Sequence, residues 1–213
     1  MIKIIIVDDH PLLREGVKKV LKAQNSNINI VAEAANGGQI LEKLQHNNNV
    51  DLIILDITLP NRNGLEVLKD IRQQYNHIPV LILSIHPEEQ FAVRAMKAGA
   101  SGYLSKSSVP DDLVKAIHRI VVEKRRYITQ DVAEQLAESM ELNTQRPAHE
   151  ILSDREFQVM YMLVNGEKVK EIADRLSLSP HTIHTYRARI FKKLNVNSNV
   201  GLIRYAIDHQ LIV

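Results

Sequence analysis

The sequence predicts an α/β fold of five βα units over residues 1–125, followed by a smaller, all-α domain of four helices over residues 150–213. In the first part, short runs of consecutive apolar residues alternate with amphipathic stretches. This alternation is typical of a parallel sheet covered by helices on both faces. From Ile151 onward the helical patterns continue, but no strand pattern appears. Residues 126–149 carry one more amphipathic stretch and then lose periodicity, which indicates a linker between two domains.

Composition excludes several classes of protein. The 213 residues are 45% hydrophobic and 24% charged, as in ordinary soluble domains. No apolar run approaches the roughly 18 residues of a membrane span, and the N-terminus shows no signal-peptide pattern. The absence of cysteine excludes disulfides and thiolate metal sites and fits a reducing cytoplasm. We therefore expect a cytoplasmic protein with no membrane partner. The net charge of +2 is too small to indicate nucleic-acid binding without a local cluster.

In the first part, each strand is expected where apolar residues follow one another, and each helix where they recur at helical spacing. The strands are expected at Lys3–Val7, Ile28–Ala34, Leu52–Leu55, Val80–Leu83 and Gly102–Leu104. The helices are expected from Pro11 through Leu21 and at Gln39–Gln45, Leu65–Gln74, Glu88–Lys97 and Asp111–Val122. Because strands and helices alternate, we expect right-handed crossovers and one parallel sheet.

Capping signals mark the helices of the second part. Ser153-Asp-Arg-Glu156 is a capping-box pattern that opens a helix to about Val164. Ser179 and Pro180 suit the N-cap and the first position of a later helix. The remaining expected helices are Thr129–Met140 in the linker, Val169–Leu176, a third that runs from Pro180 to about Leu194, and Asn199–His209. A helix, a short turn and a second helix form the helix-turn-helix arrangement.

Polar residues with complementary chemistry follow four of the expected strands. Asp8 and Asp9 follow the first strand, Asp56 follows the third, and Ser84 and Lys106 follow the fourth and fifth. Since the carboxyl ends of parallel strands meet at one sheet edge, these side chains are expected to lie together. Three carboxylates would hold a hard cation such as Mg²⁺, and Asp56 could then attack phosphorus as a nucleophile. An acidic pair alone is often only a helix cap, but the ordered set is more specific.

With these motifs, the chain resembles a bacterial two-component response regulator of the NarL/FixJ subfamily over nearly its full length. Residues 1–125 are similar to the flavodoxin-like (βα)5 receiver domain, and residues 150–213 resemble the LuxR-type helix-turn-helix. The motifs that carry the resemblance are Val7-Asp-Asp-His-Pro11, Leu55-Asp-Ile-Thr-Leu-Pro60 with Gly64, Leu83-Ser84, and Ala98-Gly-Ala-Ser-Gly-Tyr-Leu-Ser-Lys106.

The resemblance implies a role for each of these residues. Asp56 would be the phosphoacceptor, receiving phosphate from the histidine of a sensor kinase, and Lys106 would bind the phosphoryl group. Mg²⁺ would be held by Asp9, Asp56 and the backbone carbonyl of Thr58, while Asp8 would act through a bound water. Ser84 and Tyr103 would form a switch pair. The chain departs from many receivers at Ser84, where threonine is common, and at Ser107, where proline is common.

Two histidines near these motifs have more than one interpretation. His10 could be a phosphate carrier or a metal ligand, but a cap on the following helix is favoured. His86 lies two residues after Ser84. By analogy with the family, that position and Thr58 tune the hydrolysis of the aspartyl-phosphate, and loop packing is the alternative.

The helix that opens at Pro180 is the predicted DNA-reading element. Ile183, Tyr186, Ile190 and Leu194 form one stripe that we expect in the core. The opposite face collects small, hydroxyl and basic side chains, which suit the major groove of double-stranded DNA. We predict that His184, Thr185 and Ala188 lie nearest the bases, and that Thr182, Arg189 and Lys192 lie toward phosphates. Arg187, near the edge of the core stripe, is expected to reach toward a phosphate or to pair locally.

The resemblance also implies that phosphorylation releases the output domain and favours a homodimer on DNA. No enzymatic activity is expected beyond self-directed phosphotransfer and aspartyl-phosphate hydrolysis. Two alternatives stay open. A metal-dependent phosphohydrolase would need a second carboxylate two residues after Asp56, where Thr58 stands. An atypical receiver would act through protein–protein contacts without phosphorylation, but its usual mark, loss of an acidic, hydroxyl or lysine position, is not seen.

Overall fold

The structure is a computed structural model that describes residues 1–24, 27–47, 49–141 and 147–212. The chain divides into two compact units, Met1–Glu138 and Ser139–Val213, and each is described by itself. The predicted linker contains residues 142–146, which lie outside the described residues. Among the residues that are described, no helix is long and apolar enough to span a membrane.

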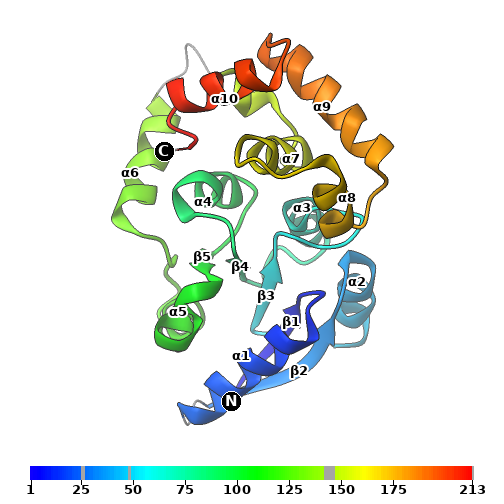
Figure 1. Ribbon diagram of the computed structural model, residues 1–213. Helices are drawn as coiled ribbons and strands as arrows, with labels where there is room; N and C mark the ends of the chain where they lie inside the picture. Colours follow the sequence, from blue (N-terminus) through cyan, green and yellow to red (C-terminus); the bar gives the residue numbers. More distant parts are fainter. Residues whose placement is uncertain (25–26, 48, 142–146, 213) are drawn as a thin grey trace. The chain divides into compact units, whose positions relative to one another are not determined.

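The first unit is organised around a parallel sheet. Within its described residues the sheet has five strands in the order β2-β1-β3-β4-β5 (Figure 1). The strands are β1 Ile2–Val7, β2 Ile28–Ala34, β3 Leu52–Asp56, β4 Val80–Ser84 and β5 Gly102–Ser105. Each neighbouring pair is parallel, which confirms the expected fold class. The direction of winding changes between β1 and β3, and a crevice for ligands forms at such a point.

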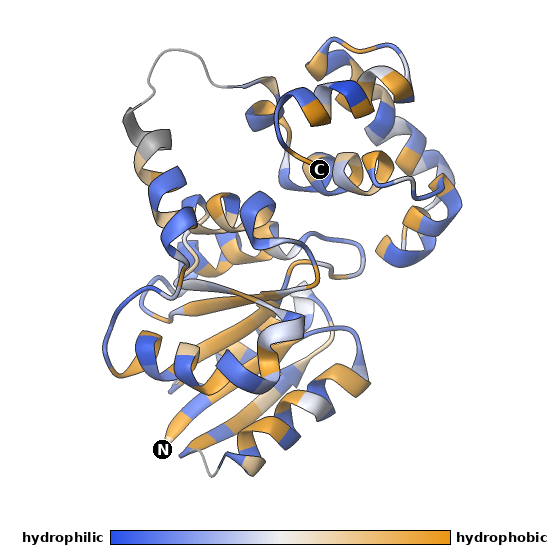
Figure 2. Ribbon diagram, turned by 60° about the vertical axis from the view of Figure 1, so that its left-hand side comes forward, coloured by the Kyte–Doolittle hydropathy of each residue, from blue (hydrophilic) through white to orange (hydrophobic). Residues whose placement is uncertain are grey.

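Helices cover both faces of this sheet. The covering helices are α1 Pro11–Ala23, α2 Gly37–His46, α3 Gly64–Gln74, α4 Glu88–Lys97 and α5 Val109–Val121. A short helix, η1, lies at Lys106–Ser108, and a further helix, α6 at Gln130–Glu141, begins in this unit. Alternate residues of β1 point to opposite faces. Ile4 and Ile6 pack with Val17 of α1 and Ile117 of α5, whereas α2, α3 and α4 lie over the other face (Figure 1). The strands are hydrophobic along most of their length, as Figure 2 shows, because both faces are covered.

Two helices of the first unit begin two residues earlier than predicted. α2 begins at Gly37 rather than Gln39, because the side chain of Asn36 accepts a hydrogen bond from the Gln39 amide at 3.0 Å and caps the helix. α5 begins at Val109 because Pro110 is tolerated in the first turn, where its missing N–H has no partner to lose. β4 extends to Ser84, so this hydroxyl belongs to the strand itself.

The second unit is helical throughout its described part. It contains a short helix η2 at Ala148–Ile151, then α7 Asp154–Val164, α8 Val169–Leu176, α9 Pro180–Leu194 and α10 Asn199–Asp208. The predicted capping box is confirmed, because Ser153 and Glu156 each bond the other's backbone amide. Ser179 accepts a hydrogen bond from the Thr182 amide at 3.0 Å and caps α9. Three residues separate α8 from α9, the turn length of a helix-turn-helix.

The predicted core stripe of α9 is correct at three of its four positions. Ile183, Ile190 and Leu194 are buried. Tyr186 is only half-buried, so its prediction as a core residue is wrong. A tyrosine keeps its hydroxyl in water unless a partner is available inside, which favours this intermediate position.

Candidate functional site

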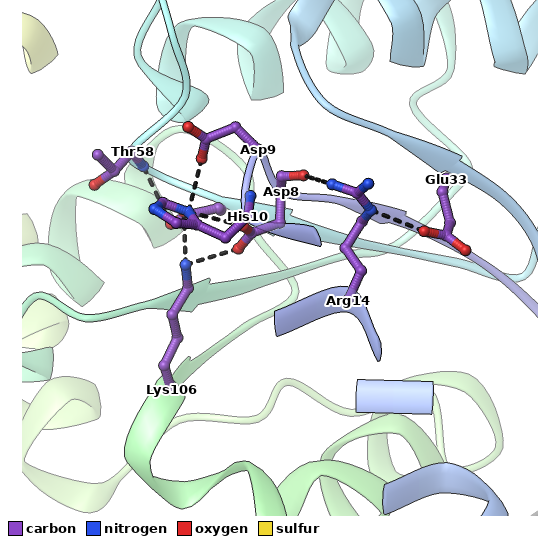
Figure 3. Close-up of polar contacts among 8 residues, drawn as sticks. Asp8, Asp9, His10, Arg14, Glu33, Thr58 and Lys106 are labelled. Carbon is purple, nitrogen blue, oxygen red and sulfur yellow. Dashed lines mark hydrogen bonds and ion pairs between the residues drawn. The ribbon is translucent and has the colours of Figure 1, made fainter. Parts of the chain in front are cut away.

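Lys106 joins two of the predicted carboxylates at the sheet edge. Its Nζ lies 2.7 Å from Oδ2 of Asp8 (Figure 3). The same Nζ lies 2.7 Å from Oδ2 of Asp56. Asp8 follows β1, Asp56 ends β3 and Lys106 follows β5, so three separate strands bring these groups together. Burial lowers the pKa of Lys106, but Asp56 and Asp8 raise it by more, so the ammonium stays charged.

Asp56 is a buried carboxylate with an elevated proton affinity. Its side chain is 1% exposed, and the Thr58 amide donates a hydrogen bond to its Oδ1 at 3.1 Å. Burial raises the pKa of Asp56 to about 7; Lys106 lowers it and Asp8 adds to the increase. Perturbed carboxylates in a crevice are characteristic of functional sites. A bound cation would favour the ionised form, which is the form that can act as a nucleophile.

The side chains around Asp9 fit a metal ion. Asp8, Asp9, His10 and Asp56 each offer a ligand atom, and these atoms lie within 4.8 Å of one another. The Oδ1 atom of Asp9 is buried, and its neighbour among the described residues is Nδ1 of His10 at 2.9 Å. Carboxylate oxygens are the ligands that Mg²⁺ prefers. The backbone carbonyl of Thr58 stays a predicted ligand.

The favoured interpretation of His10 is wrong in one respect. His10 occupies the N-cap position of α1, but its side chain makes no capping hydrogen bond. Its Nδ1 instead lies 2.9 Å from Oδ1 of Asp9 and 3.2 Å from Oδ1 of Asp8 (Figure 3). The acidic pair attracts the imidazole more strongly than the helix amides do, because the two carboxylates are the larger local charge.

His86 and Thr58 are in contact, as their predicted partnership requires. Nε2 of His86 lies 3.2 Å from the Thr58 hydroxyl. The imidazole ring also stacks on Phe91, with ring centroids 4.4 Å apart. The His86 ring therefore lies beside Thr58, whose amide donates a hydrogen bond to Asp56. They are compatible with both interpretations of His86, the tuning of hydrolysis and the packing of the loop.

Ser84 and Tyr103 meet through the backbone of His86. The hydroxyl of Tyr103 donates to the carbonyl of His86 at 2.8 Å, and the amide of His86 donates to Oγ of Ser84 at 3.1 Å. Both side chains are buried. Burial raises the pKa of Tyr103, although a hydrogen bond with Ser84 acts in the opposite direction. The Tyr103 ring is therefore turned inward in this structure, and a displacement of Ser84 would reach it directly.

Two residues close to the site were missed by the sequence analysis. Arg14 donates to the backbone carbonyl of Asp8 and to the carboxylate of Glu33 (Figure 3). Of these two residues, only Glu33 could have been noticed in the sequence, because a carboxylate inside a strand pattern needs a cationic partner. Arg14 could not have been noticed, since an arginine among the charged residues of an amphipathic helix is ordinary.

The second candidate site is the exposed side of α9. His184, Ala188, Arg189 and Lys192 are exposed, as a face that enters a DNA groove must be. The two predicted threonines are half-buried, and their hydroxyls already have local partners. Oγ1 of Thr182 lies 2.8 Å from Oγ of Ser179, and Oγ1 of Thr185 donates to the carbonyl of His181 at 3.1 Å. A contact between either hydroxyl and DNA would have to compete with these bonds or share them.

Two basic residues of α9 have partners within the second unit. The guanidinium of Arg187 lies 5.6 Å from the ring centroid of Phe191, a cation–π distance, so the expected local pairing is confirmed. Nζ of Lys193 lies 2.6 Å from the carboxylate of Glu156 in α7. Arg189 and Lys192 have no ion pair within the described part of the chain and are the cations that α9 offers to a partner.

Both units match known families of proteins. Residues 4–118 match the family described as response regulator receiver domain. Residues 150–206 match the family of bacterial regulatory proteins called the luxR family. The response regulator UvrY of Escherichia coli strain K12 is 39% identical over 212 residues, which cover 99% of this chain and 96% of UvrY. The response regulator GacA of Pseudomonas aeruginosa is 37% identical, over 100% of this chain and 98% of GacA.

Solved structures show the same fold. A LuxR-family two-component response regulator from Aurantimonas is 38% identical over 65% of this chain and 97% of its own, with a TM-score of 0.57. RcsB of Salmonella enterica serovar Typhimurium, in a promoter-bound structure, has a TM-score of 0.64 and 23% identity, over 96% of this chain and 97% of its own. At that identity the second likeness supports the fold alone.

Proposed function

The chain belongs to the two-component response regulators that join a receiver domain to a LuxR-family DNA-binding domain, and we propose that phosphorylation of Asp56 controls its binding to DNA. The observation that carries this proposal is the ion pair between Lys106 and the buried carboxylate of Asp56. It joins a nucleophile and a cation for phosphoryl oxygens at one sheet edge. We propose domain limits of 1–125 for the receiver, 126–149 for the linker and 150–213 for the DNA-binding domain.

The phosphoryl group comes from a phosphohistidine of a sensor histidine kinase. An oxygen of the Asp56 carboxylate attacks phosphorus and the P–N bond breaks as the P–O bond forms. The kinase histidine leaves as neutral imidazole, which keeps the proton already on its other ring nitrogen. Lys106 is released from its pair with the Asp56 oxygen that becomes esterified, so its charge is free to hold the phosphoryl oxygens. Ser84 donates its hydroxyl hydrogen to one of the same oxygens.

The acidic groups of the site would hold a divalent cation during this transfer. Asp8, Asp9 and Asp56, with the carbonyl of Thr58, would bind Mg²⁺, and the bound ion would neutralise charge between the carboxylates and the incoming phosphate. Water later hydrolyses the acyl phosphate and regenerates Asp56. Self-directed transfer and this hydrolysis are the only reactions that we assign to the protein.

Phosphorylation of Asp56 changes the conformation of the receiver through Ser84 and Tyr103. When Ser84 moves toward the phosphoryl group, its hydrogen bond from the His86 amide breaks or shifts. The carbonyl of His86 holds the hydroxyl of Tyr103, so that ring and the start of α4 respond together. The phosphoryl group stabilises one of two states that already exist. The active state is a homodimer whose α9 helices enter the major grooves of paired half-sites on double-stranded DNA.

Mass spectrometry of the intact protein tests the phosphoacceptor. The full chain would be incubated with Mg²⁺ and acetyl phosphate beside Asp56→Asn. We expect a single phosphoryl adduct on the parent chain and none on the variant. An adduct that persists in Asp56→Asn would contradict the assignment of Asp56. If the folded parent protein took up no phosphate, the alternative would be favoured, a receiver that acts through protein–protein contacts alone.

DNA binding is then measured with the same two proteins. Duplexes selected by the protein from a random pool would be titrated with phosphorylated and unphosphorylated chain, and fluorescence anisotropy would report the affinity. We expect tighter binding after phosphorylation and no response in Asp56→Asn. Equal affinity of the two forms would contradict the proposed coupling between the domains.

A further inference from the structure

Arg14 of α1 connects the end of β1 to β2. Its Nη1 donates a hydrogen bond to the backbone carbonyl of Asp8 at 2.6 Å, and its Nε donates to Oε2 of Glu33 at 2.8 Å (Figure 3). The Arg14 side chain is 17% exposed, so water screens these bonds only in part. One guanidinium therefore holds both a peptide group of the acidic pair and a carboxylate of the neighbouring strand.

The main chain of Asp8 is held on both sides. Its amide donates to the carbonyl of Ala34 in β2 at 3.0 Å, and its carbonyl accepts the bond from Arg14. The carbonyl of Asp8 and the amide of Asp9 belong to the same planar peptide group. A bond that fixes this plane therefore also fixes the position of the Asp9 Cα, from which that carboxylate extends.

We propose that Arg14 and Glu33 are positioning residues for the cation site. They hold the Asp8–Asp9 peptide so that both carboxylates face Asp56 before any ion arrives. This inference rests on the proposed function, because it assigns the acidic cluster to a divalent cation. Partners of metal ligands raise affinity because the ligands need no reordering when the ion binds.

The chemistry of arginine suits this task. Its planar guanidinium presents several N–H donors at fixed angles, so one side chain can hold a carbonyl and a carboxylate at once. Lysine has a single ammonium on a flexible stem, so it does not present separate donors at fixed angles to the carbonyl and the carboxylate. Glu33 fixes the orientation of the guanidinium and, in turn, accepts a bond from Lys18 at 2.7 Å. Hydrogen bonds from Lys18 and Arg14 lower the pKa of Glu33 and keep it charged.

A purely structural role is the competing explanation, because the Arg14–Glu33 pair also joins α1 to β2. Lys18 offers a matched control. It lies on the same helix and pairs with the same Glu33 carboxylate. The described hydrogen bonds and ion pairs of Lys18 do not include Asp8 or Asp9, so its loss would weaken the α1–β2 connection without releasing the acidic pair.

Mn²⁺ is the probe, because the electron paramagnetic resonance of free Mn²⁺ reports binding without any reaction. Dissociation constants would be measured for the full chain, Arg14→Met, Lys18→Met and Glu33→Gln, with thermal unfolding in parallel. We expect Arg14→Met to raise the dissociation constant by about tenfold, the lower end for residues that orient metal ligands. Lys18→Met should lower the unfolding temperature with an unchanged dissociation constant. Glu33→Gln keeps the shape of the side chain but removes its charge, and it should raise the dissociation constant by less than Arg14→Met does.

Four results would overturn the inference. The first is a folded Arg14→Met protein that binds Mn²⁺ as tightly as the parent chain. The second is an equal loss of affinity in Lys18→Met, which would show that stability alone is responsible. The third applies if Arg14→Met does not fold, and it is an unchanged dissociation constant in Glu33→Gln. A parent chain that binds no Mn²⁺ would overturn the cation site itself, and with it this part of the proposed function.

Discussion

Gly64 lies against the backbone of Asp56 with no room for a side chain. An ideal Cβ on Gly64 would overlap the carbonyl oxygen of Asp56 and come within 2.8 Å of the Ile57 Cα. The Gly64 amide also donates to the carbonyl of Ile57 at 2.8 Å, so the close approach is fixed by a hydrogen bond. The start of α3 thus supports the strand end that carries Asp56, the proposed phosphoacceptor.

Gly64→Ala should therefore damage both the fold and the site. Because the methyl group would displace backbone atoms, we expect a loss of about 1–3 kcal/mol in the free energy of unfolding, as for overpacked cores. Slower uptake of phosphate from acetyl phosphate should accompany it. Gly16→Ala in α1 is the control, since nothing lies within 4 Å of its added Cβ. It should stabilise the helix by about 0.5–1 kcal/mol. Equal behaviour of the two variants in urea unfolding would contradict this account.

The buried carboxylate of Asp56 should make stability depend on pH. Burial raises its pKa to about 7 in the folded chain, above the ordinary 3.8. Between these values the folded state binds more protons than the unfolded state, so ionisation destabilises the fold as the pH rises. Without divalent cations, Asp56→Asn should unfold at a higher temperature than the parent chain at pH 8, and this difference should shrink toward pH 4. A difference that does not vary with pH would contradict the assigned cause.

Lys192 and Lys193 are adjacent in α9 but should behave differently. Lys192 is exposed and has no ion pair within the described residues, whereas Lys193 pairs with Glu156 at 2.6 Å. We expect Lys192→Ala to weaken binding to all DNA sequences alike and to reduce the salt dependence of the affinity by about one released counterion. Lys193→Ala should mainly lower the unfolding temperature. Anisotropy titrations at several salt concentrations measure the affinity and its salt dependence, and thermal unfolding measures the stability. A change in base preference after Lys192→Ala would refute the phosphate assignment.

His86→Ala should change the lifetime of the phosphorylated protein. The His86 ring lies beside the Thr58 hydroxyl, and the Thr58 amide bonds Asp56, the proposed phosphoacceptor. Its removal would admit water to this space, so we expect faster loss of the phosphoryl adduct after the donor is removed. Ile85→Ala, in the same loop and 57% exposed, should leave the rate unchanged. An unchanged rate in His86→Ala would leave loop packing as the role of this residue.

The order of strands and helices, and the catalytic residue types, follow from local sequence. Consecutive apolar residues such as Ile53, Ile54 and Leu55 have no amphipathic helical pattern and must be buried on both sides, so they predict a central strand. Asn36 and Pro110 shifted two helix starts because a cap or a first-turn proline extends a helix beyond its apolar stripe. Asp56 and Lys106 could be predicted because parallel strands align their carboxyl ends.

Tertiary structure decided which side chains become partners. Arg14 reaches Asp8 only because α1 lies over the edge between β1 and β2, and its bond to Glu33 joins residues 19 positions apart. His10 turned from its helix toward the acidic pair because the field of the two carboxylates exceeds the attraction of the helix amides. Neither relationship is periodic in the sequence. The fold and the proposed reacting groups follow from the sequence alone, because both depend on local patterns and strand ends. The supporting contacts depend on long-range packing and electrostatics, which only the folded chain brings together.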